Sequence, residues 1–515
     1  METFIHSLKR NGSVLILFFI TIVIVQMLCN IDSYLYMQVI GQFDSAVFFM
    51  SGKALMNGMI PYTDFTDSKG ILLWFMYGMG YLLDHYSYVG VFWIMCCLLF
   101  STLCITYKTA RLYLSRQLSI WAALWLLIPL MYWNFYIETK AEHFCWPAVA
   151  LGLYVLMKSI NGRTIRRRDY FCLGASIVWC LMIKWNVAIM MLSFFVSLIW
   201  LAWKNGSLKH CLWNGGWGIV VALMPFVVYF TWVGNWQDMW QEYFVNTIAS
   251  VTTEDTSIGM TLQLFFNGWK QLFSTRMFLY LLYTLPAIVL WKRKQWFSTA
   301  LPVLCGLFFL ALSTRESSGS HYVTVAGPFA IITIIVLVMY VELFRKYILY
   351  TFILGIVYVT WGNIYYSHNF CTKDRGEFNK FMALSATMSE VGEHPTVIVL
   401  GMEPCLCMGT ALPGTRYWTL QKGRTNQMWH DELRAIKSGS SDYIIFWMVK
   451  PERYSEMLAT AGYHFLGDYF NGSVYTKHNL NMPGVIKDIS IKDIVLKRTY
   501  EEIYEENHHT NPMLQ

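Results

Sequence analysis

Residues 41–70 read GQFDSAVFFMSGKALMNGMIPYTDFTDSKG and are unusually rich in ionisable side chains for a chain this apolar. The carboxylates Asp44, Asp64 and Asp67 and the amine of Lys69 follow soon after the first long apolar run of the chain. Ionisable groups beside a bilayer are costly, and they are kept mainly where they do chemical work. We therefore expect a functional site in this segment.

Composition sets the class of the protein. The chain has 515 residues, of which 56% are hydrophobic and only 14% are charged, whereas a soluble domain is about 25% charged. The apolar residues occur in blocks long enough to cross a hydrocarbon core of about 30 Å. We predict a mainly α-helical, polytopic membrane protein. The net charge of +7 is spread over short loops and so does not indicate a nucleic-acid partner.

The hydropathy pattern predicts eleven spans, at residues 14–34, 88–107, 117–133, 142–158, 170–184, 186–203, 213–233, 277–291, 296–313, 322–344 and 347–367. Lysine and arginine gather in every second loop, and the positive-inside rule assigns those loops to the cytoplasm. An odd number of spans then places the N-terminus in the cytoplasm and the C-terminal region outside. The apolar stretch 71–84 is too short to span, so we expect it in the outer interface.

After the last span the composition changes. We expect a transmembrane catalytic domain over 1–367, a small extracytoplasmic α/β domain over 368–478 and a polar tail over 479–515. Within the α/β domain, the pattern predicts strands at 394–401 and 442–448, helices near 428–437 and 451–461, and a hairpin of 464–469 with 473–477.

The candidate site groups all fall on the predicted outer side. They are Asp44, Asp64, Asp67, Lys69, Glu138, Glu142, Lys184, Arg315, His321 and Tyr322. The acids could deprotonate a hydroxyl, and the basic groups could hold a phosphate. The sequence has no nucleotide-binding motif, and a lipid phosphate is available at an outer leaflet. The pattern thus indicates group transfer from a membrane-anchored phosphate donor.

Each of these residues also has a purely structural interpretation. Acids near the start of a helix are favoured by its dipole whatever their function, which applies to Asp44, Glu138 and Glu142. Asp64 follows a proline and could only shape a turn. Lys184 could extend from a helix end toward the interface.

A resemblance sharpens the prediction. D-S-A-x-F at 44–48, G-K-A-L-x-x-G at 52–58 and I-P-Y-x-D-F-x-D-x-K-G at 60–70 resemble the first outer loop of the GT-C glycosyltransferases. The chain is most similar to bacterial members related to protein O-mannosyltransferases and lipid A aminoarabinose transferases. The chain has Ile71 where such relatives usually have proline. The resemblance implies that Asp44 is the catalytic base and that Lys69 contacts the lipid phosphate.

The implied reaction is a single, inverting displacement. A polyprenyl-phosphate sugar would be the donor, and a hydroxyl of a lipid, glycan or protein would be the acceptor, at the outer face of a bacterial cytoplasmic membrane. Lys184, Arg315 or His321 would help Lys69 to stabilise the departing phosphate. Whether a divalent cation takes part stays open, although Asp44 with Glu138 or Glu142 could hold one.

Other classes fit parts of the pattern. A transporter or flippase of lipid-linked saccharides would carry ionisable groups near the bilayer midplane and broken helices in matching halves. A surface-glycan polymerase would share most of the predicted site. A membrane scaffold that presents the outer domain would not need the loop acids.

Overall fold

The computed structural model describes residues 2–35, 43–85, 87–132, 139–247, 319–373, 388, 391–392, 394–400, 410–418, 426–447, 451–469 and 472–480. The chain divides into two compact units. We call Met1–Asn30, Trp93–Trp232 and Glu254–Ser367 the membrane unit, and Ile31–Phe92, Val233–Thr253 and His368–Gln515 the loop unit. The sequence did not lead us to expect that residues 31–92 would group with the C-terminal region. The predicted domain boundaries stay a prediction.

Helices make up the described part of the membrane unit. They are α1 (Glu2–Cys29), α4 (Val89–Ala110), α5 (Arg116–Trp125), α6 (Leu127–Leu130), the 3₁₀ helix η1 (His143–Cys145), α7 (Trp146–Ile160), α8 (Arg167–Leu181), α9 (Trp185–Lys204), α10 (Leu208–Val233), the 3₁₀ helix η3 (Gly319–Phe329), α15 (Ala330–Tyr340), α16 (Glu342–Lys346) and α17 (Ile348–Lys373). The first residues of α4, the last residue of α10 and the last residues of α17 belong to the loop unit.

Six segments of the described chain are long and apolar enough to cross a membrane. They are Gly12–Cys29, Val89–Ala110, His143–Ile160, Trp185–Lys204, Leu208–Val233 and Ile348–Tyr365. The protein is therefore a multi-pass membrane protein, as the composition predicts. The expected spans 277–291 and 296–313 lie outside the described residues, so the count of eleven stays a prediction.

Some predicted spans correspond to shorter helices. The predicted spans 117–133 and 322–344 correspond to the apolar segments Arg116–Leu130 and Thr324–Tyr340. In the first of these, Pro129 has no N–H to donate to the carbonyl four residues earlier, and the helix is interrupted between α5 and α6. In the second, the chain begins as the 3₁₀ helix η3, which contains Pro328.

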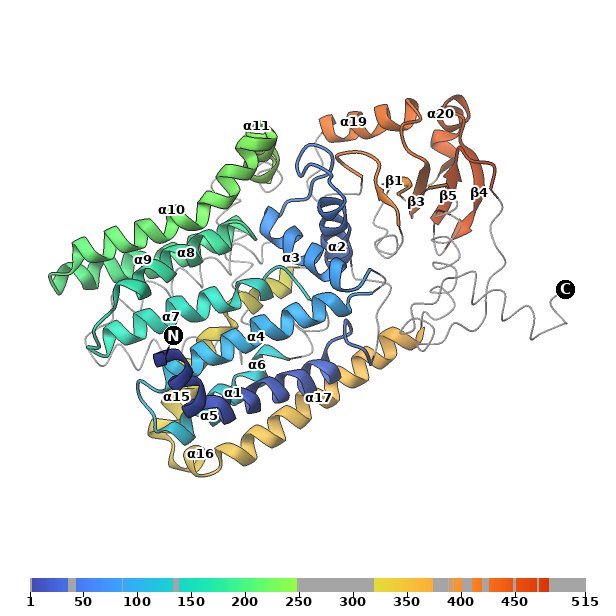
Figure 1. The fold of residues 1–515 in the computed structure, drawn as a ribbon. Helices are drawn as coiled ribbons and strands as arrows, with labels where there is room; N and C mark the ends of the chain where they lie inside the picture. The colour runs from blue at the N-terminus through green and yellow to red at the C-terminus, as the bar shows by residue number, and fades with distance from the viewer. Residues whose placement is uncertain are drawn as a thin grey trace, which may run out of the picture. The chain divides into compact units, whose positions relative to one another are not determined.

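In the membrane unit, α7, α8 and α9 pack against one another, and α10 runs alongside α8 (Figure 1). Glycines allow α8 and α10 to approach closely. A Cβ atom added at Gly174 would collide with the carbonyl of Gly215, and one added at Gly218 would collide with the carbonyl of Phe171. Small residues at such crossings are typical of helix packing inside membranes.

The loop unit combines helices with a sheet. Its helices are α2 (Phe43–Met56), α3 (Ile71–Leu83), α11 (Trp236–Met239), the π-helix η2 (Trp240–Asn246), α19 (Asn426–Lys437), the 3₁₀ helix η5 (Pro451–Tyr454) and α20 (Ser455–Thr460). The strands are β1 (Thr396–Leu400), β2 (Leu412–Pro413), β3 (Tyr443–Trp447), β4 (His464–Tyr469) and β5 (Gly472–Thr476), in the order β2-β1-β3-β5-β4. β1 is parallel to β2 and β3, and β5 is antiparallel to β3 and β4.

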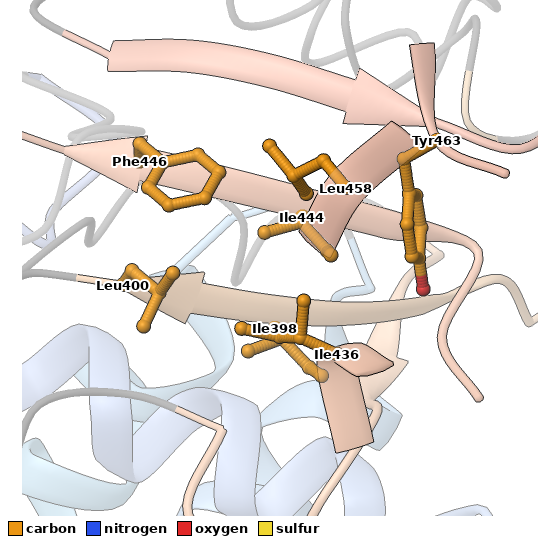
Figure 2. Close-up of a cluster of buried hydrophobic side chains, with 7 residues drawn as sticks. All are labelled: Ile398, Leu400, Ile436, Ile444, Phe446, Leu458 and Tyr463. Carbon is orange, nitrogen blue, oxygen red and sulfur yellow. The ribbon is translucent and has the colours of Figure 1, made fainter. Parts of the chain in front are cut away.

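A buried cluster joins the sheet to its helices (Figure 2). Because side chains alternate along a strand, Ile398 and Leu400 of β1 and Ile444 and Phe446 of β3 share one face. Ile436 of α19 and residues of α20 and its following turn complete the cluster, whose members are Ile398, Leu400, Ile436, Ile444, Phe446, Leu458 and Tyr463. The strands and helices anticipated from residues 394–477 correspond to these elements.

Candidate active site

Asp44 lies in the first turn of α2, where a carboxylate is favoured by the helix dipole. Its side chain is half-buried. Glycines set the contact between α2 and α3, because a Cβ atom added at Gly52 would collide with the backbone N of Gly78. The G-K-A-L part of the motif thus has a packing role, and it places α2 directly against α3.

The loop after α2 is fixed by its own hydrogen bonds. Asp64 Oδ2 accepts from the backbone N–H of Ile60 at 2.7 Å, so Asp64 closes the turn, as its structural interpretation predicts. The backbone N–H of Tyr62 donates to the carbonyl of Phe65 at 2.7 Å. The hydroxyl of Tyr62 donates to the carbonyl of Lys69 at 3.0 Å. Tyr62 therefore ties the turn to the end of the loop.

Tyr62 has an unusual backbone. Its φ is 66°, in the left-handed region that residues other than glycine rarely adopt. Its ring is 1% exposed and lies 4.8 Å from the ring of Trp74 and 6.1 Å from that of Tyr243, measured between centroids. Burial raises the pKa of its hydroxyl, which therefore stays protonated and able to donate. Such strained residues persist only where the surrounding structure holds them, and they gather at functional sites.

Asp67 and Lys69 lie together at the end of the loop. Asp67 Oδ1 accepts from the backbone N–H of Ser68 at 2.6 Å, and Lys69 Nζ lies 3.9 Å from the same oxygen. Lys69 Nζ also donates to the hydroxyl of Ser68 at 3.0 Å and lies 5.3 Å from the centroid of the Phe48 ring. Within the described chain, Asp67 Oδ2 is buried and makes no hydrogen bond. The loop thus carries an amine and a carboxylate oxygen that a ligand could contact.

Ile71 occupies the first position of α3, directly after the N-cap residue Gly70. The first helical position is the one at which proline is favoured, because its missing N–H would have no partner there. Isoleucine at this position leaves the start of the helix intact. Ile71 thus stands at a position of the helix that would also accept proline.

In the membrane unit, Lys184 Nζ forms an ion pair with Glu142 Oε1. Lys184 lies just before α9 and Glu142 just before η1, and both side chains are largely buried. The sequence predicts that both lie on the outer side, but it does not predict this pair. A phosphate that binds Lys184 would have to share it with Glu142. Next to the pair, His143 Nδ1 accepts from the backbone N–H of Lys140 at 3.1 Å.

The remaining predicted site residues are less fully described. Glu138 and Arg315 lie outside the described residues, and His321 and Tyr322 are described only as part of the backbone of η3. In the described part of the chain, no group of three or more His, Cys, Asp or Glu side chains could hold a metal ion. A divalent cation thus stays an open expectation.

The loop unit also contains an ionic cluster that the sequence did not predict. It consists of Asp238, Glu242, Arg416 and Tyr417, and it contacts the loop at Thr63. The two acids follow a span, and Arg416 and Tyr417 lie 174 or more residues further on. These residues belong to no motif, so only their burial and pairing in the folded chain show that they act together.

Comparison with known proteins places this geometry in a known fold. No family model matches the chain, and no curated protein matches it. Among solved structures, ArnT from Cupriavidus metallidurans bound to undecaprenyl phosphate covers 92% of this chain and 100% of its own, with 12% identity and a TM-score of 0.60. Its apo state gives the same coverage and identity, with a TM-score of 0.56. The fold is therefore similar to that of ArnT and is GT-C glycosyltransferase-like.

This similarity of fold confirms the resemblance found in residues 44–70. The archaeal oligosaccharyltransferase AglB from Archaeoglobus fulgidus, in complex with an inhibitory peptide and a dolichol-phosphate, covers 92% of this chain and 75% of its own. Its identity is 10% and its TM-score is 0.42.

Proposed function

We propose that this protein is a membrane glycosyltransferase that moves a sugar from a polyprenyl-phosphate donor to an acceptor hydroxyl. The observation that carries the proposal is the GT-C fold, which matches all of the ArnT chain bound to undecaprenyl phosphate. The first outer loop adds support, because Asp44, Asp67 and Lys69 all belong to the same compact unit, the loop unit. A membrane scaffold would not require these charges.

Asp44 is the general base of the proposed reaction. Its carboxylate takes the proton of the acceptor hydroxyl, and the acceptor oxygen bonds to the anomeric carbon. The bond between that carbon and the phosphate oxygen breaks, and its electron pair leaves with the lipid phosphate. The attack and the departure take place on opposite faces of the carbon, so its configuration inverts.

Lys69 stabilises the charge that develops on the leaving phosphate. Its side chain is 16% exposed and its Nζ lies 3.9 Å from Asp67 Oδ1, so a phosphate oxygen can compete with this carboxylate for the ammonium group. Lys184, Arg315, His321 and Tyr322 are proposed to complete the phosphate site. For Lys184 this requires that the phosphate draws it away from Glu142.

The other acidic residues of the site have supporting roles in this proposal. Asp64 shapes the loop, and Asp67, Glu138 and Glu142 support the site or contact the acceptor. The reaction takes place at the outer face of a bacterial cytoplasmic membrane, and the acceptor is a lipid, a glycan or a protein.

The test is sugar transfer by purified protein in liposomes. Radiolabelled polyprenyl-phosphate sugars are offered with a membrane extract as acceptor, and wild type is compared with Asp44→Asn. Loss of a general base typically lowers turnover by about 10²–10⁴-fold, so we expect a loss of this size in Asp44→Asn. Asp431→Asn is the matched control, because Asp431 lies on α19 and pairs only with the exposed Arg434 among its described ion pairs.

The outcomes separate the candidate functions. Transfer that survives in Asp44→Asn would keep the enzyme and move the base to Asp67, Glu138 or Glu142. Movement of the labelled lipid across the bilayer without transfer would indicate a flippase. Products with many added sugar units would indicate a glycan polymerase.

A further inference from the structure

Arg416 joins three segments of the loop unit that are far apart in the sequence. Its Nε donates to the carbonyl of Thr63 at 3.0 Å, and its own carbonyl accepts from the backbone N–H of Thr66 at 3.0 Å. Its Nη2 lies 3.2 Å from Asp238 Oδ1, and its Nη1 lies 3.5 Å from Glu242 Oε1. A guanidinium group reaches these acceptors from three separate nitrogen atoms in a planar fork, whereas a lysine has a single nitrogen.

The acids that face Arg416 are held by further contacts. The hydroxyl of Tyr417 donates to Glu242 Oε1 at 2.6 Å, and the hydroxyl of Thr63 donates to Asp238 Oδ2 at 2.7 Å. The side chain of Glu242 is only 3% exposed. Burial alone would lower the pKa of Arg416, but Asp238, Tyr417 and Glu242 raise it above its usual value. The cluster thus keeps Arg416 charged, and loss of Arg416 would leave two carboxylates without this cation.

The loop residues held by Arg416 lie next to the strained part of the loop. Thr63 directly follows Tyr62, whose φ is 66° and whose hydroxyl donates to the carbonyl of Lys69. On the other side, Asn235 Nδ2 donates to the carbonyl of Pro61 at 2.7 Å. A buried tyrosine keeps such a backbone only where contacts on both sides hold it. A continuous set of contacts therefore leads from Arg416 through Tyr62 to the backbone of Lys69.

We propose that Arg416 is a positioning residue for the transfer reaction. By holding Thr63 and Thr66, it keeps residues 60–70 in the shape that presents Lys69 to the phosphate of the donor. The inference rests on the proposed function for the reaction itself. It assigns to the C-terminal part of the chain a direct role in the geometry of the first outer loop.

The experiment compares Arg416→Ala and Arg416→Lys with Arg434→Ala in the full chain. Arg434 is the matched control, because its side chain is 79% exposed and it pairs with Asp431 within α19. Two quantities are measured: kcat and KM for a polyprenyl-phosphate sugar, and amide hydrogen exchange of residues 60–70. Small displacements of a positioned group cost about 10²-fold in rate.

We expect Arg416→Ala to lower kcat by about 10²-fold and to speed exchange in residues 60–70. Exchange in β1 and β3, which a general loss of stability would also affect, should stay unchanged. Arg416→Lys keeps the positive charge but lacks the planar, forked arrangement of donors. Its kcat and its exchange rate in residues 60–70 should lie between those of Arg416→Ala and wild type. Arg434→Ala should match wild type in both measurements.

Two outcomes would overturn the proposal. One is that Arg416→Ala matches Arg434→Ala in both kcat and exchange of residues 60–70. The other is that exchange rises equally in the loop and in β1 and β3, which would make Arg416 merely structural. If Arg416→Ala does not fold, Arg416→Lys and Asp238→Asn answer the same question with the same measurements. If wild type transfers no sugar, the proposed function fails, and hydrogen exchange still decides whether Arg416 holds the loop.

Discussion

Glu142 and Lys184 form an ion pair whose side chains are 3% and 9% exposed. Removing both charges from water is costly, and their mutual attraction offsets the cost only while both are present. From the sequence, we expect Lys184 to bind phosphate and Glu142 to support the site. The structure joins the two roles, because any anion that reaches Lys184 must compete with Glu142.

Single substitution of this pair should be more harmful than double substitution. Lys184→Met leaves the carboxylate of Glu142 buried without its cation, and we expect a loss of about 3–5 kcal/mol in stability. Glu142→Gln combined with Lys184→Met removes both charges and should recover most of that loss. Thermal unfolding of the purified protein in detergent measures both effects. A double variant no more stable than Lys184→Met would show that the two charges do not stabilise each other.

Among the elements, the crossing of α2 and α3 shows how packing places the site. Asp44 begins α2, and Lys69 lies just before α3, so the angle and spacing of the two helices decide where these charges lie. Glycines allow the close approach. A Cβ atom at Gly52 would meet the backbone of Gly78 and of Trp74, which cannot move aside as a side chain could.

Gly52→Ala should therefore destabilise the protein. Overpacking of a tight contact typically costs about 1–3 kcal/mol, and we expect a loss in this range together with reduced transfer activity. Gly216→Ala on α10 is the matched control, because a Cβ atom there would meet no other atom within 4 Å. Thermal unfolding of both variants provides the comparison. Equal melting temperatures would contradict the close contact of α2 and α3.

At the scale of the whole molecule, the charge distribution predicts the orientation in the membrane. Lysine and arginine gather in alternate loops, and an odd number of spans places the two termini on opposite sides. Part of the chain that carries two of these spans lies outside the described residues. The orientation is therefore a prediction that the described helices alone do not test.

Epitope tags at the two ends of the chain test this orientation. We expect an antibody to reach a tag after Gln515 in intact spheroplasts, and to reach a tag before Met1 only after permeabilisation. A tag on a known cytoplasmic protein controls for leakage. Access to both tags, or to neither, before permeabilisation would mean an even number of spans. The proposed outer location of the loop unit would then need a different path for the chain.

The sequence predicted much at the level of local pattern. The apolar blocks indicated a multi-pass membrane protein, and residues 44–70 indicated the GT-C fold that the comparison with ArnT confirms. The position of Asp44 at the start of a helix also followed from the sequence. These features depend on hydropathy, helix ends and turn residues, which act over a few neighbouring positions.

Only the tertiary structure decided which charges meet. Glu142 and Lys184 are 42 residues apart, and Arg416 and Thr63 are 353 residues apart. Hydropathy and motif spacing carry no information about such partners, because a pair forms only when distant segments fold against each other. The sequence alone thus determined that this is a multi-pass membrane protein and which charged residues its first outer loop carries. The pairing of Lys184 with Glu142 and the hold of Arg416 on the loop come from packing, which brings buried charges to the partners that offset their desolvation.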